Sequence, residues 1–251
     1  MANQNTVFPN GNSPSEPVFI RPANLWDYEY IGLNAANTYD NTPLTVWLSP
    51  NRNEHWMQYV RGFRYRALAR MVDPRNLTLV ACKGSPGGKV VGHIQAERMG
   101  NDAGAKAYIN SRWSPLLIIL GWVLSVWWKA LGLLVGDKSS HEGNLMMFLK
   151  TAAEDEKLYW EDAKRKSRWH VQSCVVLKEF QGRGVGRRLL ESITAKAEEE
   201  GVVVGLEASE EGEHLYLKCG FKLLGRFRGN FGAAPGKGGV MLWSPTGKKR
   251  V

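Results

Sequence analysis

The stretch Gln181-Gly182-Arg183-Gly184-Val185-Gly186 decides the fold of this chain. It follows the apolar run from Val171 to Leu177 and precedes a helical pattern that begins at Arg187. Glycines at alternate positions permit left-handed backbone conformations and leave no Cβ between the backbone N–H groups and a bound anion. The free amides at the start of a helix add partial positive charge. The order strand, glycine loop and helix therefore predicts a cradle for phosphate groups.

Two common nucleotide-binding loops do not fit this stretch. A dinucleotide-binding loop needs a third glycine in G-x-G-x-x-G, and Arg187 occupies that position. A P-loop needs Gly-Lys followed by Ser or Thr, a sequence that the stretch lacks. The remaining alternative is a glycine-rich turn between a strand and a helix that holds no ligand.

The composition favours one domain in a reducing compartment. A chain of 251 residues is long enough to bury a full core. The net charge is +9, but Lys and Arg are scattered and lack the aromatic interleaving of a nucleic-acid binder, so we expect no nucleic-acid partner. Cys82, Cys174 and Cys219 are too few and too far apart to indicate a disulfide framework or a metal site. Since no charged-then-apolar leader opens the chain, we expect a cytoplasmic protein.

Strands and helices are both predicted in the first half of the chain. Residues 1–17 are rich in Asn, Ser and Pro and are expected to form a disordered arm. The elements expected next are a strand at 18–21, a helix from Asn24, a helix at 54–72, and a hairpin of 77–83 and 89–98. The Pro43 to Pro50 segment is expected to be a loop, and the residues before Trp113 a connector.

An apolar run opens abruptly at Trp113 and continues to Val135. It is long enough to span a membrane, but a single crossing would separate two halves of one sheet. A helix here would carry a narrow small-and-polar stripe and an otherwise apolar surface with several tryptophans: Gly121, Ser125, Lys129 and Gly132 form the stripe, and Trp113, Trp122, Trp127 and Trp128 lie among the rest. We expect this segment to pack over the domain or within a homodimer, or to make peripheral membrane contact.

The remaining elements are plainer. A charged helix is predicted at 145–166, with Leu145, Leu149, Ala152 and Tyr159 on one side. Further elements are expected as a strand at 169–177, a helix at 187–200, a strand at 202–207 buried on both faces, a helix at 211–219, and a closing hairpin of 221–227 and 240–243. Residues 245–251 form a basic tail.

Two ordered motifs resemble those of the GNAT acetyltransferases. Residues 168–180 followed by QGRGVG resemble the fourth strand and the Q/R-x-x-G-x-G/A cofactor loop of that family. Leu215-Tyr-Leu-Lys-Cys-Gly-Phe221 matches its L-Y-x-K-x-G-F motif further along. The arrangement also resembles a group of fungal GNAT proteins with a Trp-rich insertion before the fourth strand. The resemblance covers roughly residues 18–243, and the insertion lies outside the shared core.

The resemblance implies a fold and a reaction. The fold would be an α/β (α+β) acyl-CoA N-acyltransferase domain at residues 18–244, with a mixed, mostly antiparallel twisted sheet, helices on both faces, and an apolar helical insertion at about 113–165. The reaction would move the acetyl group of acetyl-CoA to an amine acceptor, without a metal. A non-catalytic module that binds CoA, a membrane or a protein on the same fold is the alternative.

The resemblance also implies the roles of individual residues. Tyr216 matches the family tyrosine that acts as general acid toward the leaving thiolate. Residues expected to bind acetyl-CoA are Val175, Val176, Leu177, Gln181, Gly182, Arg183, Gly184, Val185, Gly186, Ser209 and Tyr216. The general base is open between His170, which shares a strand face with Gln172, and the rivals Glu97 and Glu207. A water path to bulk solvent is a further alternative.

Overall fold

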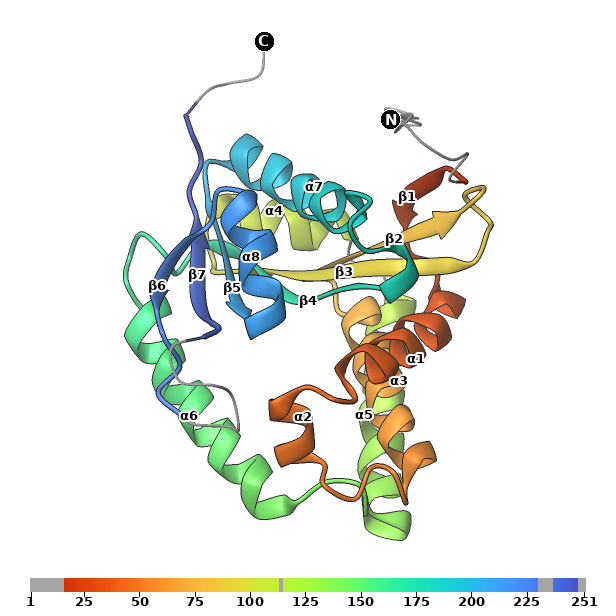
Figure 1. The fold of residues 1–251 in the computed structure, drawn as a ribbon. Coiled ribbons are helices and arrows are strands. Elements are labelled where there is room, and N and C mark those ends of the chain that lie inside the picture. Colours follow the sequence, from red (N-terminus) through yellow and green to blue (C-terminus); the bar gives the residue numbers. More distant parts are fainter. Residues whose placement is uncertain (1–15, 113–114, 230–236, 248–251) are drawn as a thin grey trace.

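A seven-stranded sheet lies at the centre of the computed structural model, which describes residues 16–112, 115–229 and 237–247 (Figure 1). The strand order is β1-β2-β3-β4-β5-β7-β6. The strands are β1 (Val18–Pro22), β2 (Asn76–Lys83), β3 (Val90–Met99), β4 (Arg168–Val176), β5 (Val203–Ala208), β6 (Lys222–Gly225) and β7 (Gly239–Trp243). β4 and β5 run parallel, whereas the neighbouring pairs on either side are antiparallel. The predicted mixed, mostly antiparallel sheet is confirmed.

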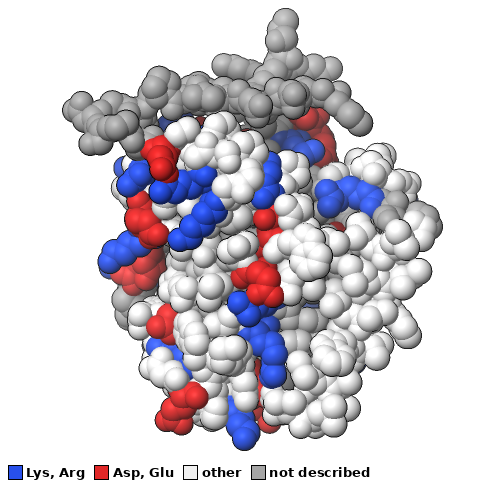
Figure 2. Space-filling model, turned by 90° about the vertical axis from the view of Figure 1, so that its right-hand side faces the viewer, with Lys and Arg blue, Asp and Glu red and all other residues white. Residues whose placement is uncertain are grey.

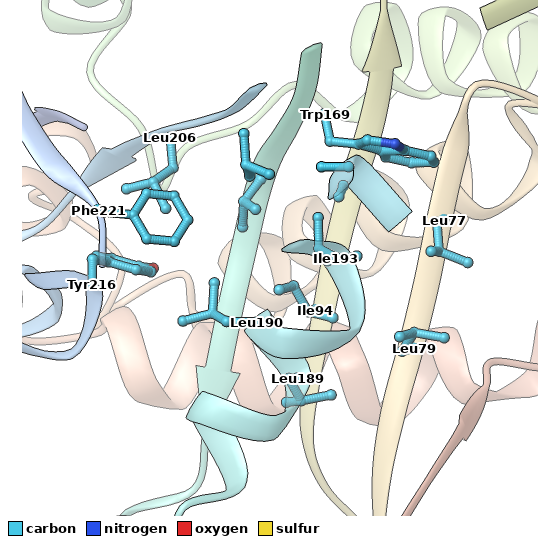
Figure 3. Close-up of a cluster of buried hydrophobic side chains, with 14 of the residues drawn as sticks. Leu77, Leu79, Ile94, Trp169, Leu189, Leu190, Ile193, Leu206, Tyr216 and Phe221 are labelled. Carbon is cyan, nitrogen blue, oxygen red and sulfur yellow. The ribbon is translucent and has the colours of Figure 1, made fainter. Parts of the chain in front are cut away.

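Helices cover both faces of this sheet, as predicted (Figure 1). One face carries α1 (Tyr28–Tyr39) and α3 (Trp56–Val72), preceded by the short η1 (Leu25–Asp27), and the other carries α7 (Val185–Glu200). Residues on one side of α7, including Leu189, Leu190 and Ile193, pack on the sheet in the main apolar core (Figure 3). Gly201 ends α7 in the left-handed conformation, as its position predicts. The helix α8 (Glu210–Lys218) follows β5.

Two short helices stand where the sequence suggested irregular chain. α2 (Pro43–Leu48) begins with proline at its first position, and the Thr42 side chain accepts a hydrogen bond from the Thr45 amide. α4 (Ala103–Arg112) packs Tyr108 edge-on against Trp169, with ring centroids 4.8 Å apart. The predictions of a loop and a connector were therefore wrong. Proline fits the first turn of a helix, where its missing N–H has no partner to lose.

The parallel pair β4–β5 separates before either strand ends. Pairing runs from Arg168 with Val203 to Val171 with Leu206 and stops there, although β4 continues to Val176. On the other side of β4, the register to β3 slips by one residue, so that Gln172 forms a bulge between the pairs Gln95–Ser173 and Ala96–Val171. A V-shaped opening therefore lies between the C-terminal parts of β4 and β5.

The insertion between β3 and β4 contains α4, α5 (Pro115–Val135) and α6 (Glu142–Trp160). α5 is the one helix of the described residues that is long and apolar enough to cross a membrane, by length and composition. It packs on α3, where Trp128 stacks on Tyr65 at 3.9 Å and a Cβ at Gly121 would lie 3.5 Å from Val72. The side of α5 that carries Gly121 and Trp128 thus faces the protein, whereas Lys129 and Gly132 of the small-and-polar stripe are exposed. Trp113 lies outside the described residues.

The domain covers only one side of α5, and the rest of its apolar surface faces outward, so homodimer or membrane contact by that surface stays a prediction. No described residue of α5 is buried. Trp122, Trp127 and Leu133 keep 69%, 62% and 89% of their surfaces exposed. The side of the molecule that carries α1, α3 and α5 shows a broad area without charged side chains (Figure 2). Met99 of β3 pairs with Arg168 of β4, so a single crossing by α5 would pull apart two bonded strands.

The helix α6 ends at Trp160, earlier than predicted, and its predicted apolar side is not buried. Leu145 and Leu149 are 40% and 52% exposed, whereas Asp155 and Trp160 are buried. At its start, the Asn144 side chain donates a hydrogen bond to the Trp47 carbonyl over 2.7 Å. At its end, the Trp160 ring leaves no room for a Cβ on Gly205 of β5. α6 therefore bridges from α2 to the far half of the sheet (Figure 1).

Candidate active site

The glycine loop has the shape of an anion cradle. Gly182 and Gly184 take left-handed conformations with φ of +73° and +75°, and a Cβ at either would meet nothing within 4 Å. Gly184 is the N-cap of α7, and no side chain caps that helix. The first amides of α7, at Val185, Gly186 and Arg187, have no partner within the helix itself. Open space, unpaired donors and the positive end of a helix fit a pyrophosphate group.

The neighbours of the loop complete this end of the site. Gly186 is needed for a different reason, because a Cβ there would lie 3.1 Å from Leu215 of α8. The Gln181 side chain donates to the Val176 carbonyl over 2.9 Å and ties the loop to the end of β4. The Arg183 guanidinium lies 5.2 Å from the centre of the Phe180 ring in η2 (Lys178–Phe180), at the mouth of the cradle.

The amides of β4 divide between two directions. Leu177 donates its N–H to the Val91 carbonyl at 2.9 Å, so this amide is engaged with β3. Alternation along the strand turns the Val175 amide the same way and the amides of Cys174 and Val176 into the opening toward β5. The bond from Gln181 to the Val176 carbonyl agrees with this direction. Of the three predicted residues, Val176 thus offers its N–H to a ligand between the strands.

A cavity of about 420 Å³ lies at the opening between β4 and β5. Its wall comes from α1, α2, α3, α6, β4, α8 and the segments around β5 and β7, and Ser209 and Tyr216 belong to it. The acidic residues Asp155, Glu156, Glu207, Glu210 and Glu211 line it, and Lys237 is the one Lys or Arg among the described lining residues. Lys237 pairs with Glu210. The cavity therefore favours a cationic ligand such as an ammonium group.

Tyr216 is fixed at one side of this cavity. Its ring is 8% exposed and packs at 61° to Phe221, with centroids 5.8 Å apart (Figure 3). Burial raises the pKa of the Tyr216 phenol well above its usual value of 10, and the nearby Cys174 thiol adds to this. The phenol is therefore protonated at neutral pH and can donate a hydrogen bond or a proton.

Glu207 and His170 form one hydrogen-bonded unit. Glu207 Oε2 lies 2.8 Å from His170 Nε2, and Glu207 Oε1 accepts from Trp160 Nε1 at 3.2 Å. Arg168 Nε donates to His170 Nδ1 over 3.2 Å. Because a guanidinium can only donate, Nδ1 must accept. Nε2 therefore carries the ring proton and donates a hydrogen bond to Glu207. Both nitrogens of His170 are thus engaged, whereas Glu207 faces the cavity with 42% of its side chain exposed.

Glu97 lies behind Gln172 rather than in the cavity wall. Gln172 Nε2 donates to Glu97 Oε2 over 2.7 Å, which leaves Gln172 Oε1 buried without a hydrogen-bond partner among the described residues. Burial, together with the charge of Asp73, raises the pKa of Glu97. Gln172, at the bulge of β4, borders the cavity. The catalytic assignments of His170 and Glu97 remain predictions; Glu207 and Gln172 line the cavity, whereas His170 and Glu97 are not among its lining residues.

Several lining residues were not predicted from the sequence. Asp155 of α6 is 6% exposed, and its Oδ1 makes no hydrogen bond within the described residues. Arg66 and Arg70 of α3 line a second, adjoining cavity. A signal for the arginines was present: Arg66 and Arg70 follow Phe63 by three and seven residues, on the side of the helix predicted to face inward.

Comparison with known proteins agrees with this geometry. Residues 146–223, from α6 to β6, match the family model of the acetyltransferase (GNAT) domain. No curated protein sequence matches the chain. A structure of a histone acetyltransferase HPA2 and related acetyltransferase from Corynebacterium glutamicum superposes with a TM-score of 0.58 at 16% identity, covering 93% of this chain and 99% of that one.

Other solved structures superpose less closely. The PaiA N-acetyltransferase of Thermoplasma acidophilum, in complex with coenzyme A, gives a TM-score of 0.47 at 12% identity and covers 90% of this chain and 98% of its own. Arabidopsis thaliana NAA60 with a bisubstrate analogue gives 0.47 at 12% identity and covers 92% and 99%. Residues 146–223 are thus similar to the acetyltransferase (GNAT) domain, and the chain shares its fold with the Corynebacterium glutamicum acetyltransferase.

Proposed function

We propose that this protein transfers the acetyl group of acetyl-CoA directly to an amine acceptor while both are bound. One observation carries the proposal: an anion cradle at the start of α7 lies at one end of the opening between β4 and β5, and an acidic cavity lies at the other. Acetyl-CoA, when bound, supplies an activated thioester. The amides from Gly182 to Gly186 would hold its pyrophosphate, with Arg183 beside it.

The residues of the cavity have complementary tasks. The Val176 and Cys174 amides, which point into the opening, would donate to the ligand along β4. The protonated Tyr216 phenol would donate to the leaving sulfur. Glu207 would hold the incoming ammonium and receive its proton, directly or through cavity water. Burial pushes the pKa of Glu207 upward, but the hydrogen bonds from His170 and Trp160 and the charge of Arg168 outweigh burial and keep it below its usual value. Glu207 therefore stays anionic, and His170 positions it.

The experiment has two arms. Isothermal titration with acetyl-CoA tests the cradle, and release of free thiol in the presence of a panel of amines tests transfer. Binding with thiol release that depends on the amine supports the proposal. Binding without release for any amine would instead favour a non-catalytic CoA-binding module on the same fold. Absence of binding would refute both.

We further propose that the protein is cytoplasmic and touches a membrane through the outer side of α5, without crossing it. The three cysteines are all free within the described structure, which supports a reducing compartment. The exposed face of α5 combines tryptophans with aliphatic side chains, a composition suited to the membrane interface. The net charge of +9 favours an anionic surface. A homodimer through the same face is the other outcome that a binding test must distinguish.

A further inference from the structure

Two arginines of α3, the exposed Arg66 and the half-buried Arg70, line one cavity. Arg66 and Arg70 are one helical turn apart on the side of α3 that faces the sheet. Arg70 Nη1 donates to Gln95 Oε1 over 3.3 Å, and the Arg66 guanidinium lies 4.3 Å from the centre of the Phe63 ring. No ion pair between either arginine and a carboxylate exists within the described residues. By contrast, Arg64 on the same helix pairs with Glu29 at 2.8 Å.

The electrostatics of this pair are unfavourable without an anion. Burial together with the charge of Arg66 lowers the pKa of Arg70 to about 10. Both groups nevertheless remain cationic at neutral pH. Two like charges that face one cavity are stabilised when an opposite charge joins them. Asp137 and Glu97 act on Arg66 and Arg70 only through space, so the cavity is a positive site without an ion-paired carboxylate among the described residues.

The two arginines line a cavity of about 140 Å³ between α3 and the sheet. Its lining includes His93, which is fully buried, has a pKa lowered by burial to about 3, and is therefore neutral. His93 Nε2 lies 3.0 Å from Ser173 Oγ, while His93 Nδ1 is buried without a hydrogen-bond partner among the described residues. No Asp or Glu lies among the described residues of this lining. The polar groups that remain suit an anion.

This cavity adjoins the acidic one. Tyr39, Phe63, Gln172 and Ser173 line both. Gln172 lies at this border, and the direction of its amide is fixed because Nε2 donates to Glu97, which leaves the buried Oε1 without a partner among the described residues. An amide oxygen accepts from an ammonium N–H. One molecule that lies across the border would thus meet acceptors for an amine on one side and two guanidiniums on the other.

We propose that the acceptor is an amine that also carries a carboxylate, held by Arg66 and Arg70 while its amine lies in the acidic cavity. The planar guanidinium fork matches a carboxylate in a bidentate geometry. This proposal rests on the proposed function and names the substrate class of the same site. It assigns Arg66 and Arg70 to specificity, separately from the groups that act on the thioester.

The test uses acceptor pairs that differ only by a carboxylate: L-lysine with cadaverine, and L-arginine with agmatine. The parent protein should acetylate the carboxylate member with the higher kcat/KM. In Arg66→Gln and Arg70→Gln, KM for that member should rise by about tenfold or more, with little change for its partner. Arg66→Lys, which keeps the charge but loses the fork, should give a partial loss. Arg64→Gln is the matched control and should behave as the parent.

A second measurement does not depend on acetyl transfer. Sodium acetate, compared with chloride at equal ionic strength, should raise the melting temperature of the parent and of Arg64→Gln but not of the double variant Arg66→Gln/Arg70→Gln. Acetyl-CoA titration checks that each variant is folded. Equal use of both members of each pair, or an acetate effect that survives the double substitution, would overturn the subsite. Failure of acetyl-CoA binding would overturn the proposed function instead, and the acetate measurement would still decide the subsite.

Discussion

Gln172 donates to Glu97 over 2.7 Å, and this one bond fixes the direction of the Gln172 amide oxygen. Gln172→Ala removes that oxygen and should lower kcat/KM for the amine by about tenfold or more, with acetyl-CoA affinity unchanged. Steady-state kinetics and titration measure the two quantities. A Gln172→Ala variant with the kcat/KM of the parent would show that the oxygen does not contact the amine.

The same bond predicts a pH dependence. When Glu97 is protonated, its O–H can donate to the amide oxygen of Gln172 in place of accepting from Nε2, so the Gln172 amide loses its fixed orientation. Because burial raises the pKa of Glu97 above the usual 4.5, activity should fall as the pH drops through a value above 4.5. Glu97→Gln should remove this limb of the kcat/KM profile. A limb that persists in Glu97→Gln would assign it to another group.

The cofactor cradle is tested at Gly184. Gly184→Val places a β-branched side chain at a φ of +75° and beside the unpaired amides, so acetyl-CoA affinity should fall by at least about tenfold. The matched control is Gly87→Val in the β2–β3 turn, where the φ is ordinary and a Cβ would meet nothing within 4 Å. Isothermal titration compares the two. Equal affinities in the two variants would remove the cradle from the proposal.

Tyr216→Phe separates chemistry from binding. The substitution removes only the hydroxyl, so kcat should fall by about tenfold or more while the acetyl-CoA Kd stays within about twofold. Tyr108→Phe serves as the control, because Tyr108 packs on Trp169 away from the cavity and its pKa is likewise raised by burial, to about 12. If the two variants turn over equally fast, Tyr216 has a packing role.

The outer side of α5 is tested with charge. Trp122→Glu/Trp127→Glu should abolish co-sedimentation with liposomes that contain anionic lipid, and the binding of the parent should weaken as salt increases. Leu217→Glu/Leu223→Glu changes two exposed apolar residues on α8 and β6 and should leave sedimentation intact. Parent protein that stays in the supernatant and elutes as a dimer, converted to a monomer by the tryptophan substitutions, would identify the homodimer instead.

Asp102 links the start of the insertion to the core. It accepts from the fully buried Arg98 at 2.8 Å. Burial alone would raise its pKa, but the Ala105 amide, Ser167 and Arg98 hold it at about 2, below the usual 3.8. Asp102→Asn should therefore cost about 1 kcal/mol of unfolding free energy at pH 7, a modest value because solvent screens the carboxylate.

The sign of the pH effect follows from that lowered pKa. The contribution of Asp102 is complete above the unfolded value of 3.8 and is lost as the pH falls through about 2. The difference between parent and Asp102→Asn in urea unfolding should thus shrink between these two pH values. Asp162→Asn, at an exposed pair 3.8 Å from Arg165, is the control with little effect. A difference that does not change with pH would contradict the assignment.

The sequence predicted the sheet and the cradle because each depends on local pattern. Alternation and β-branched runs mark β2, β3 and β4, and the glycines mark the turn into α7. The acceptor side depends on contacts between distant residues. In the sequence, Asp155 is one of several charged residues of α6. It is buried in the structure because the end of α6 packs near β5, where Asp155 Oδ1 lies 3.9 Å from Arg228 Nε.

Other differences have equally physical origins. His170 remains a predicted base, and the sequence did not show that Arg168, two positions earlier on the same strand, donates to its Nδ1. The apolar run of α5 is long enough to cover a core, yet only one side of it contacts α3, through Gly121 and the stacked ring of Trp128, and its other apolar side chains stay exposed. Sequence spacing alone does not show which atom a side chain bonds to, or which side of a helix faces the protein.

The pairing of Met99 with Arg168 gives the insertion neighbouring ends. An insertion whose two ends join a pair of directly opposite residues in neighbouring strands can be replaced by another insertion without a change in strand order or register. Here the exchanged part would carry α4, α5 and α6, and with them Asp155 and the outer tryptophans, while the cradle at α7 stays in place. Exchange of this insertion would then change the acceptor preference and the surface contact together, and would leave the binding of acetyl-CoA unchanged.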